Sequence, residues 1–263
     1  MALVRCDYFS DVLEMGTSMT VLLPQATSAQ IGVSGSTPQT GGRRHGAPVL
    51  YLLHGLSDDA TAWTRYTSIE RYVEPLGLAV VMPQVARSFY LDQAHGGRYW
   101  EHLSQEVPAV AESFFRLSAR RDDTFVAGLS MGGYGAMKWA LHQPERFAAA
   151  ASLSGALDLA RRQASGALRP DLADAAVGDR QVAGSDDDLL ALLERQVAAS
   201  HDLPALYVGC GTDDELVSES RSFLDAADRL GVPVTRELDR GAHDWAFWDE
   251  RIQHVLDWLP LER

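Results

Sequence analysis

Short runs of consecutive apolar residues recur along the chain, separated by more polar stretches. Many residues in these runs are β-branched, which favours strands. Runs that are apolar at nearly every position are typical of strands covered on both faces, so they predict a buried, mostly parallel sheet. The runs are PVLYLLHG from Pro48, LAVVMP from Leu78, TFVAGLS from Thr124, FAAAASLSG from Phe147, PALYVGCG from Pro204 and VPVTREL from Val232.

Between these runs, apolar residues recur every three or four positions, which is the spacing of one face of a helix. Two such stretches are Phe223, Leu224, Ala227 and Leu230, and Trp248, Ile252, Val255, Leu256 and Leu259. Strands that alternate with amphipathic helices predict an α/β fold in which helices cover both faces of a central sheet. A chain of 263 residues has room for one such domain, and we expect residues 1–263 to form it.

Three segments depart from this alternation. VRCDYFS and SMTVLLP precede the first crossover helix, so we expect them to form an antiparallel N-terminal edge of the sheet. Residues 25–47 are rich in Gly, Ser and Thr without periodicity, which predicts a flexible surface loop. Residues 158–200 are rich in Ala and Asp with helical patches, and we expect an irregular, partly helical, cap-like segment over the carboxyl edge of the sheet.

Charge and composition narrow the functional classes. The formal net charge of −13 repels phosphate backbones and anionic lipid, so neither nucleic acid nor a membrane is an expected partner. The sequence shows no signal-peptide pattern and no apolar stretch long enough to span a bilayer, so we expect a cytoplasmic protein. Cys6 and Cys210 are too few for a disulfide framework and are expected to be buried, reduced thiols.

A serine flanked by glycines stands where a predicted strand gives way to a predicted helix, in FVAGLSMGGYGAMKWAL from Phe125 to Leu141. Gly128, Ser130 and Gly132 match the pattern G-x-S-x-G. A nucleophile on so sharp a strand-to-helix turn leaves no room for side chains two residues away. The context predicts that Ser130 is a nucleophile; the alternative is a tight turn that only packs the helix on the sheet.

A serine hydroxyl needs an imidazole to accept its proton and a carboxylate to orient that imidazole. In folds that carry this motif the chain order is serine, acid, histidine. His243 follows the last predicted strand, so it lies at the carboxyl edge where α/β active sites are found. We therefore predict that His243 is the general base; the alternative is a helix-entry histidine paired with Asp244.

The acid should follow a strand between Ser130 and His243. PALYVGCG ends at Gly211 and is followed by Asp213 and Asp214, so one of these two carboxylates is the expected third member. Either could instead cap the helix that follows. Spacing does not choose between the two neighbours.

The oxyanion of an acyl-transfer intermediate needs two backbone N–H donors. One comes from the residue after the nucleophile, which is Met131, and the other from a loop after the first central strand. There a tight turn at His54 and Gly55 would present the N–H of Leu56. We expect the ring of His54 to hold this loop in place rather than to act as a second base.

Two further pairs of residues need an interpretation. Asp58 and Asp59 precede Thr61 and have no histidine or cysteine at ligand spacing, so helix capping is favoured over a metal site. Tyr99 and Trp100 lie in the glycine-flanked segment HGGRYW, and we predict that they line a small acyl or alcohol pocket. The alternative for both aromatic residues is packing of a helix face on the sheet.

Taken together, these motifs resemble the esterase D family of α/β-hydrolases, and more narrowly its small bacterial tributyrin-type esterases. Those esterases are related to S-formylglutathione hydrolases and more distantly to feruloyl esterases and mycolyltransferases. The resemblance spans most of the chain from Tyr8 to Pro260. The motifs are YLLHGLSDDATAWTRYTSIERY, LAVVMP, GLSMGGYGAMKWAL, AAAASLSGALD, CGTDDEL and GAHDWAFWD.

The resemblance implies an α/β-hydrolase fold and a serine carboxylesterase that cleaves small-molecule, short-chain esters through an acyl-enzyme without metal or cofactor. Relatives read Gly-Thr-Glu-Asp where this chain reads Gly-Thr-Asp-Asp, which maps the catalytic aspartate to Asp214 and leaves Asp213 as a departure. It also maps the oxyanion donors to Leu56 and Met131. A thioesterase of the S-formylglutathione hydrolase kind, an acyltransferase, a non-catalytic binding protein and a homo-oligomer stay open.

Overall fold

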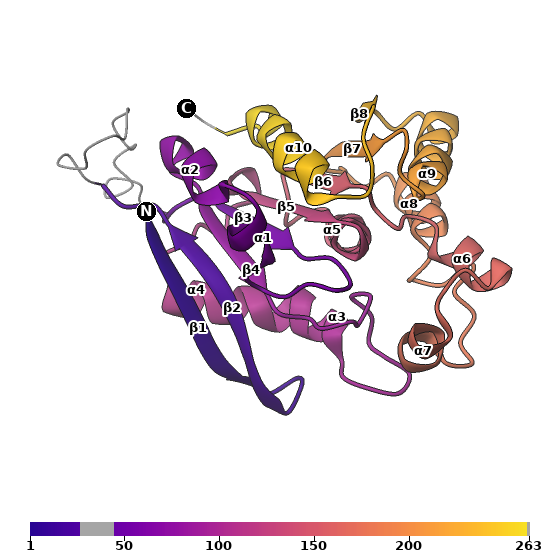
Figure 1. Ribbon diagram of the computed structural model, residues 1–263, viewed down its shortest axis with the longest axis horizontal. Coiled ribbons are helices and arrows are strands. Elements are labelled where there is room, and N and C mark those ends of the chain that lie inside the picture. Colours follow the sequence, from indigo (N-terminus) through magenta and orange to yellow (C-terminus); the bar gives the residue numbers. More distant parts are fainter. Residues whose placement is uncertain (27–44, 262–263) are drawn as a thin grey trace.

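A mixed sheet of eight strands runs through the part of the chain that the computed structural model describes, residues 1–26 and 45–261 (Figure 1). The strand order is β1-β2-β4-β3-β5-β6-β7-β8. β1 and β2 are antiparallel, β2 pairs antiparallel with β4, and the remaining pairs are parallel. The strands are β1 (Ala2–Ser10), β2 (Met15–Leu23), β3 (Val49–Leu53), β4 (Ala79–Pro83), β5 (Thr124–Leu129), β6 (Ala149–Leu153), β7 (Ala205–Gly211) and β8 (Val234–Asp239).

This architecture confirms the predicted parallel sheet and its antiparallel N-terminal edge. Every residue of β3, β4, β5 and β6 is buried, as expected of strands covered on both faces. Of the loop predicted at 25–47, residues 27–44 lie outside the described residues. Both cysteines are free thiols, with Cys6 half-buried and Cys210 fully buried.

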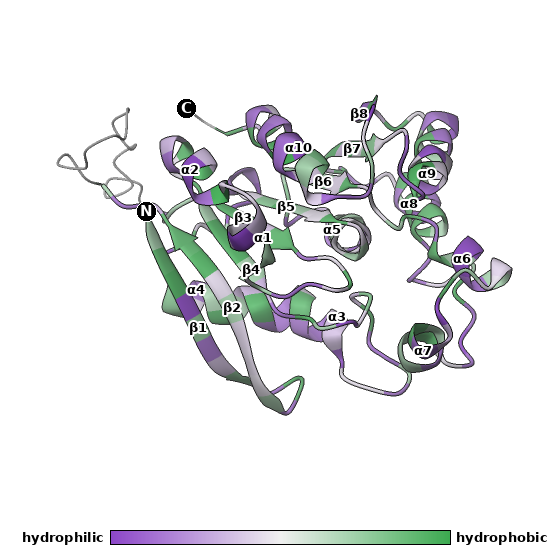
Figure 2. Cartoon of the chain, in the orientation of Figure 1, coloured by the Kyte–Doolittle hydropathy of each residue, from purple (hydrophilic) through white to green (hydrophobic). Residues whose placement is uncertain are grey.

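Successive side chains of a central strand enter two separate apolar layers. In β3, Val49, Tyr51 and Leu53 pack into one layer, and Leu50 and Leu52 pack into the other. This alternation follows from the pleat of a strand, which points neighbouring side chains to opposite faces. Figure 2 shows the resulting concentration of hydrophobic residues along the central strands.

Helices cover both faces of the sheet. The first layer contains buried side chains of α4, α5, α8 and α9, and the second contains those of α1, α2 and α10. The helices are α1 (Ala62–Tyr66), α2 (Ile69–Val73), α3 (Tyr99–Glu101), α4 (Val107–Phe114), α5 (Met131–His142), α6 (Leu159–Ser165), α7 (Pro170–Leu172), α8 (Leu189–Ala198), α9 (Val217–Leu230) and α10 (Trp245–Trp258). Short 3₁₀ turns lie at Glu74–Leu76 and Arg121–Asp123, and π turns at His102–Glu106 and Ala173–Val177.

The segment 158–200 contains α6, α7, a π turn and α8, joined by irregular chain. Figure 1 shows α6 and α7 on the side of the molecule opposite β1 and β2. Leu168, Leu172 and Ala176 from this segment are buried in the first apolar layer, so the segment is packed against the body of the fold. In the described part of the chain, no helix is long and apolar enough to cross a membrane.

Three elements meet closely at the end of β5. A Cβ atom added to Gly128 would lie 2.3 Å from the carbonyl oxygen of Gly132, and one added to Gly132 would lie 2.5 Å from the carbonyl oxygen of Leu53. Real Cβ atoms essentially never come so near to backbone. The two glycines therefore allow β3, β5 and the first turn of α5 to approach one another.

We predict that Gly128→Ala destabilises the fold by about 1–3 kcal/mol, because the added methyl group overpacks a contact made of backbone. Gly16→Ala is the matched control, since a Cβ at Gly16 in β2 would meet nothing within 4 Å. That control should change the free energy of unfolding by less than about 0.5 kcal/mol. Urea denaturation of the two variants measures the difference, and equal stabilities would contradict the close approach described.

Candidate active site

Ser130 occupies a strained turn between β5 and α5. Its backbone adopts φ 54° and ψ −118°, a region that side chains other than glycine rarely enter. The turn is fixed by hydrogen bonds: the N–H of Ser130 donates to the carbonyl of Leu153 at 2.9 Å, and its carbonyl accepts from the N–H groups of Gly133 and Ala156. The strained conformation places the hydroxyl at the N-terminal end of α5, at the carboxyl edge of the sheet.

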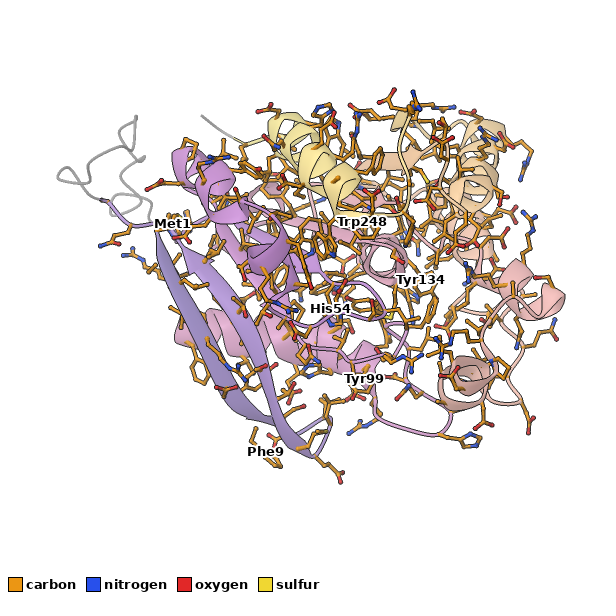
Figure 3. All side chains as sticks on the ribbon, viewed as in Figure 1. Met1, Phe9, His54, Tyr99, Tyr134 and Trp248 are labelled. Carbon is orange, nitrogen blue, oxygen red and sulfur yellow. The ribbon has the colours of Figure 1, made fainter. Side chains whose placement is uncertain are left out.

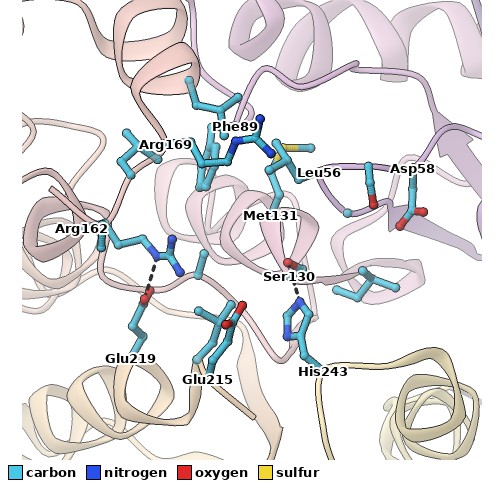
Figure 4. Close-up of a pocket in the computed structure, with 18 of the residues that line it drawn as sticks. Leu56, Asp58, Phe89, Ser130, Met131, Arg162, Arg169, Glu215, Glu219 and His243 are labelled. Atoms are coloured by element: carbon cyan, nitrogen blue, oxygen red, sulfur yellow. Dashed lines mark hydrogen bonds and ion pairs between the residues drawn. The ribbon is translucent and has the colours of Figure 1, made fainter.

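The imidazole of His243 joins Ser130 to a carboxylate. His243 Nε2 lies 3.0 Å from Ser130 Oγ, and its Nδ1 lies 2.9 Å from Asp214 Oδ2 (Figure 4 shows the contact of Ser130 with His243). The three residues follow β5, β7 and β8, whose carboxyl ends meet at one edge of the sheet. The structure thus brings together the predicted nucleophile, base and acid. The His243 ring also packs edge-on against the indole of Trp248, with ring centroids 4.9 Å apart.

Asp214 is buried, with only 3% of its surface exposed. Burial by itself raises the pKa of the Asp214 carboxyl, but hydrogen bonds to the carboxylate outweigh burial and hold that pKa below its ordinary value. The donors are the His243 ring, the Leu216 amide and the Ser154 hydroxyl. Asp214 is therefore suited to hold His243 with Nδ1 protonated and Nε2 free to accept a proton.

The structure separates the two aspartates that spacing left undecided. Asp213 is exposed to solvent, and its backbone N–H donates to the carbonyl of Gly241 at 2.9 Å. Asp214 is the neighbour whose carboxylate contacts His243. The two neighbours thus differ in burial and in contacts, and the carboxylate that reaches His243 is that of Asp214.

Ser154 supports this arrangement and was not predicted from the sequence. It follows β6, has φ 49° and is fully buried. Its hydroxyl accepts a hydrogen bond from Trp248 Nε1 at 3.1 Å and contributes to the lowered pKa of Asp214. Its position just past a strand end, at the same edge as Ser130, was the signal available in the sequence.

Leu56 and Met131, the predicted oxyanion donors, both lie beside Ser130. Both residues line the same pocket as Ser130 and His243, and Figure 4 shows them side by side next to Ser130. Met131 is the first residue of α5, and the first N–H groups of a helix have no acceptor within that helix. The partial positive charge of this helix end also favours a developing negative charge.

His54 holds the loop that carries Leu56. Its Nδ1 contacts the carbonyl oxygen of Gly55 at 2.8 Å, and its Nε2 lies 3.2 Å from the backbone N–H of Val85. A ring that donates through Nδ1 and accepts through Nε2 is neutral. His54 is 1% exposed and lies among densely packed side chains (Figure 3), and this burial lowers its pKa. These contacts match the structural role predicted for it.

The pocket in front of Ser130 has a volume of about 850 Å³. One wall comes from the loop at Gly55 to Asp58, and another from α10 and the His243 loop. A third wall comes from the segment 158–200, which contributes Arg161, Arg162, Ser165, Ala167, Leu168, Arg169 and Leu172. The segment thus forms part of the pocket in front of Ser130.

Tyr99 and Trp100 lie elsewhere, so the structure does not support their predicted place in the pocket. Tyr99 lines a separate hollow against the β1–β2 hairpin. The Trp100 ring packs on His142 and beneath the Lys138 ammonium, which lies 4.3 Å from the ring centroid. The reason is the direction of α3, whose two aromatic rings contact the β1–β2 hairpin and α5 instead. The aromatic residues of the pocket are Phe89, Trp245 and Trp248.

Asp59 fixes the turn before α1 but does not cap the helix as predicted, since no side chain accepts from the first N–H groups of α1. Its Oδ1 accepts hydrogen bonds from the N–H of Thr61 at 2.8 Å and from the Thr61 hydroxyl at 2.6 Å. Asp58 lies half-buried at the edge of the pocket. Within residues 1–26 and 45–261, no three His, Cys, Asp or Glu side chains are grouped so that they could hold a metal ion.

Two comparisons with known protein sequences identify this chain as similar to esterases. The family model described as "Putative esterase" matches residues 25–259. An acetyl esterase of Caldicellulosiruptor saccharolyticus is 30% identical over 273 residues, and the alignment covers 98% of each chain. Both matches include Ser130, Asp214 and His243 within their span.

Solved structures extend the comparison to three dimensions. The fluorophosphonate-binding serine hydrolase FphF of Staphylococcus aureus matches with a TM-score of 0.87 and 36% identity over 99% of each chain. The S-formylglutathione hydrolase FrmB of the same organism matches with a TM-score of 0.85 and 35% identity over 98% of each chain. The whole described fold, including the N-terminal hairpin, is shared with these proteins.

The buried ring of His54 predicts an acid-sensitive fold. Because burial lowers its pKa, the folded state keeps the ring neutral while the unfolded chain binds a proton below about pH 6.5. Stability should then fall as the pH drops below that value, by up to about 1.4 kcal/mol per pH unit from this ring. His54→Asn should make the slope shallower in urea denaturation series between about pH 5 and 6.5.

His201→Asn is the control for this prediction, because His201 is exposed. It should leave the pH dependence of the unfolding free energy as it is in the wild type. The same slope in His54→Asn and in the wild type would show that His54 does not stay neutral in the folded protein.

Proposed function

Because this chain belongs to the esterase family and is a carboxylic ester hydrolase with the α/β-hydrolase fold, we propose that it cleaves short-chain acyl esters through an acyl-enzyme on Ser130. The observation that carries the proposal is the line of contacts from Ser130 Oγ through the His243 ring to the Asp214 carboxylate. This line ends in a pocket of about 850 Å³, which is large enough for a small ester.

In the first step, Ser130 Oγ attacks the ester carbonyl carbon while His243 Nε2 takes the hydroxyl proton. The distance of 3.0 Å between these two atoms lies within hydrogen-bond reach. The imidazolium that forms is stabilised by the Asp214 carboxylate, which stays ionised because its pKa is held low. The carbonyl oxygen becomes an oxyanion, and the N–H groups of Leu56 and Met131 are the proposed donors to it.

Collapse of this intermediate breaks the ester C–O bond, and His243 returns the proton to the departing alcohol oxygen. Water then attacks the acyl-enzyme, gives its proton to His243 and releases the carboxylic acid, which restores the Ser130 hydroxyl. The route consumes one water molecule and one ester. It therefore requires neither a metal ion nor an organic cofactor.

We further propose that residues 1–263 form one domain in which the segment 158–200 acts as a cap. Its support is the placement of α6 and α7 along the pocket together with the burial of Leu168 and Leu172 in the first apolar layer. A cap of this kind sets the shape of the pocket opposite the loop of Leu56. It also reduces the access of bulk water to the reacting atoms.

A second candidate function is hydrolysis of thioesters. The observation in its favour is the similarity to FrmB, an S-formylglutathione hydrolase that is nearly as similar to this chain as FphF is. Thioesters pass through the same oxyanion, so the residues around Ser130 serve either reaction. The ratio of kcat/KM for S-formylglutathione to kcat/KM for p-nitrophenyl acetate distinguishes the two functions, and a ratio well above one favours the thioesterase.

The direct test of the proposed function is Ser130→Ala. Removing the nucleophile should lower kcat for p-nitrophenyl acetate or butyrate by about 10⁴-fold or more. Ser113→Ala is the control, because Ser113 is an exposed serine on α4 outside this pocket. It should keep activity within about threefold. Turnover by Ser130→Ala at the wild-type rate would refute the proposal.

The adjacent aspartates supply a matched pair of variants. Asp214→Asn should lower kcat by about 10³- to 10⁴-fold, since an amide favours the wrong tautomer of His243. Asp213→Asn makes the same chemical change on an exposed side chain and should alter kcat by less than about threefold. Steady-state kinetics of the two variants decide the assignment, and a larger loss at Asp213 would reverse it.

A further inference from the structure

The cap-side wall of the pocket is rich in arginine. Arg161 and Arg162 lie on α6, and Arg169 lies just before α7. All three line the pocket that contains Ser130. The pocket is also lined by four carboxylates, those of Asp58, Glu215, Glu219 and Asp244, so its positive charge is confined to the wall formed by the segment 158–200.

Arg162 is held in a fixed orientation by a carboxylate from α9. Its Nε donates to Glu219 Oε1 at 2.7 Å, and the other carboxylate oxygen, Oε2, accepts the backbone N–H of Asp158 at 3.2 Å. The Glu219 side chain is 9% exposed and that of Arg162 is 20% exposed. Because Glu219 is itself fixed at both oxygens, it holds the guanidinium plane in one position.

The other edge of the Arg162 guanidinium faces the pocket. Figure 4 shows the group extending from the wall toward the side of the pocket where Ser130 and His243 lie. Within the described residues, Nη1 and Nη2 of Arg162 have no hydrogen-bond partner. A guanidinium edge with two parallel N–H donors matches the two oxygens of a carboxylate.

The buried ion pair of Lys138 and Asp187 differs from the pair of Arg162 and Glu219 in where its donors point. The Lys138 ammonium is 2% exposed and contacts the Asp187 carboxylate at 2.6 Å, the carbonyl of Tyr90 at 3.1 Å and the ring of Trp100. Its donors are directed at protein groups in the interior. Arg162 differs because one edge is fixed by protein and the opposite edge is directed into the pocket.

Arg162 has two further arginines as neighbours on this wall of the pocket. Arg161 is exposed on the same helix and has no ion-pair partner among the described residues, so it adds positive potential. Arg169 is paired with Asp171 at 3.1 Å. Glu215, exposed just before α9, is an opposing carboxylate in the lining of the pocket.

We propose that Arg162, oriented by Glu219, binds a carboxylate carried by the substrate, so that the preferred esters are anionic. This inference rests on the proposed function, since it concerns the same pocket. It makes Arg162 a specificity-determining residue, whereas Ser130 and His243 carry out the reaction. The carboxylate belongs either to the acyl group or to the alcohol, and matched substrates distinguish these two cases.

The kinetic test uses two pairs of esters that differ by one negative charge. On the alcohol side the pair is 4-acetoxybenzoate and its methyl ester; on the acyl side it is 4-nitrophenyl hydrogen succinate and 4-nitrophenyl methyl succinate. Arg162→Gln keeps an N–H that can donate to Glu219 but loses the charged edge. It should lower kcat/KM for the anionic ester of one pair by about ten- to a hundredfold, mainly through KM.

The neutral ester should change by less than about twofold, and the pair that shows the effect identifies the side that carries the carboxylate. Arg5→Gln is the control, because it removes the same charge from an exposed Arg–Asp pair on β1. It should preserve the preference for the anionic ester. An equal loss for both members of each pair, or no loss in either, would overturn the proposal.

A binding measurement separates this inference from the proposed function. Calorimetric titration of Ser130→Ala with 4-acetoxybenzoate and with 4-nitrophenyl hydrogen succinate reports binding without turnover. Adding Arg162→Gln should weaken binding of one of these anions by about tenfold or more. Unchanged binding of both anions would contradict the anion subsite even if the protein is an active esterase. Conversely, weaker binding in Arg162→Gln would support the subsite even if Ser130 is not the nucleophile.

Discussion

The close approach of backbone at the end of β5 is the constraint on which the site depends. Gly128 and Gly132 let the first turn of α5 pack against β3 and β5, and only then does Ser130 adopt its strained conformation with the hydroxyl at the sheet edge. The strain costs of order 1–3 kcal/mol, which the hydrogen bonds of this turn and the packing of α5 must offset. If the Ser130 backbone left this strained conformation, its hydroxyl would move away from His243.

The remaining site follows from the parallel order of the strands. Because β5, β6, β7 and β8 are neighbours that run in one direction, the residues after each strand end lie together although they are far apart in the sequence. Ser130, Ser154, Asp214 and His243 each follow one of these four strands. Buried hydrogen bonds then hold the carboxylate ionised and the imidazole oriented, and helix α5 directs its positive end to the same point.

The central strands and the turn that carries Ser130 could be predicted from the sequence, since apolar runs mark buried strands and the glycine pattern marks the serine turn. The choice between Asp213 and Asp214 could not, because it depends on which way neighbouring side chains of one turn point. Tyr99 and Trp100 were wrongly placed because proximity in sequence does not report the direction of α3. The pair of Arg162 and Glu219 was missed because the two residues are 57 positions apart and meet only through tertiary packing.

The proposed mechanism requires that His243 activate the Ser130 hydroxyl. Reaction with a fluorophosphonate, followed by intact-mass measurement and peptide mapping, tests this claim most directly because the phosphonyl group stays on the attacking oxygen. If His243 activates Ser130, one adduct per chain forms on Ser130, and its formation becomes at least about a hundredfold slower in His243→Gln. An adduct on another residue, or labelling of Ser130 at the same rate in both proteins, would contradict it.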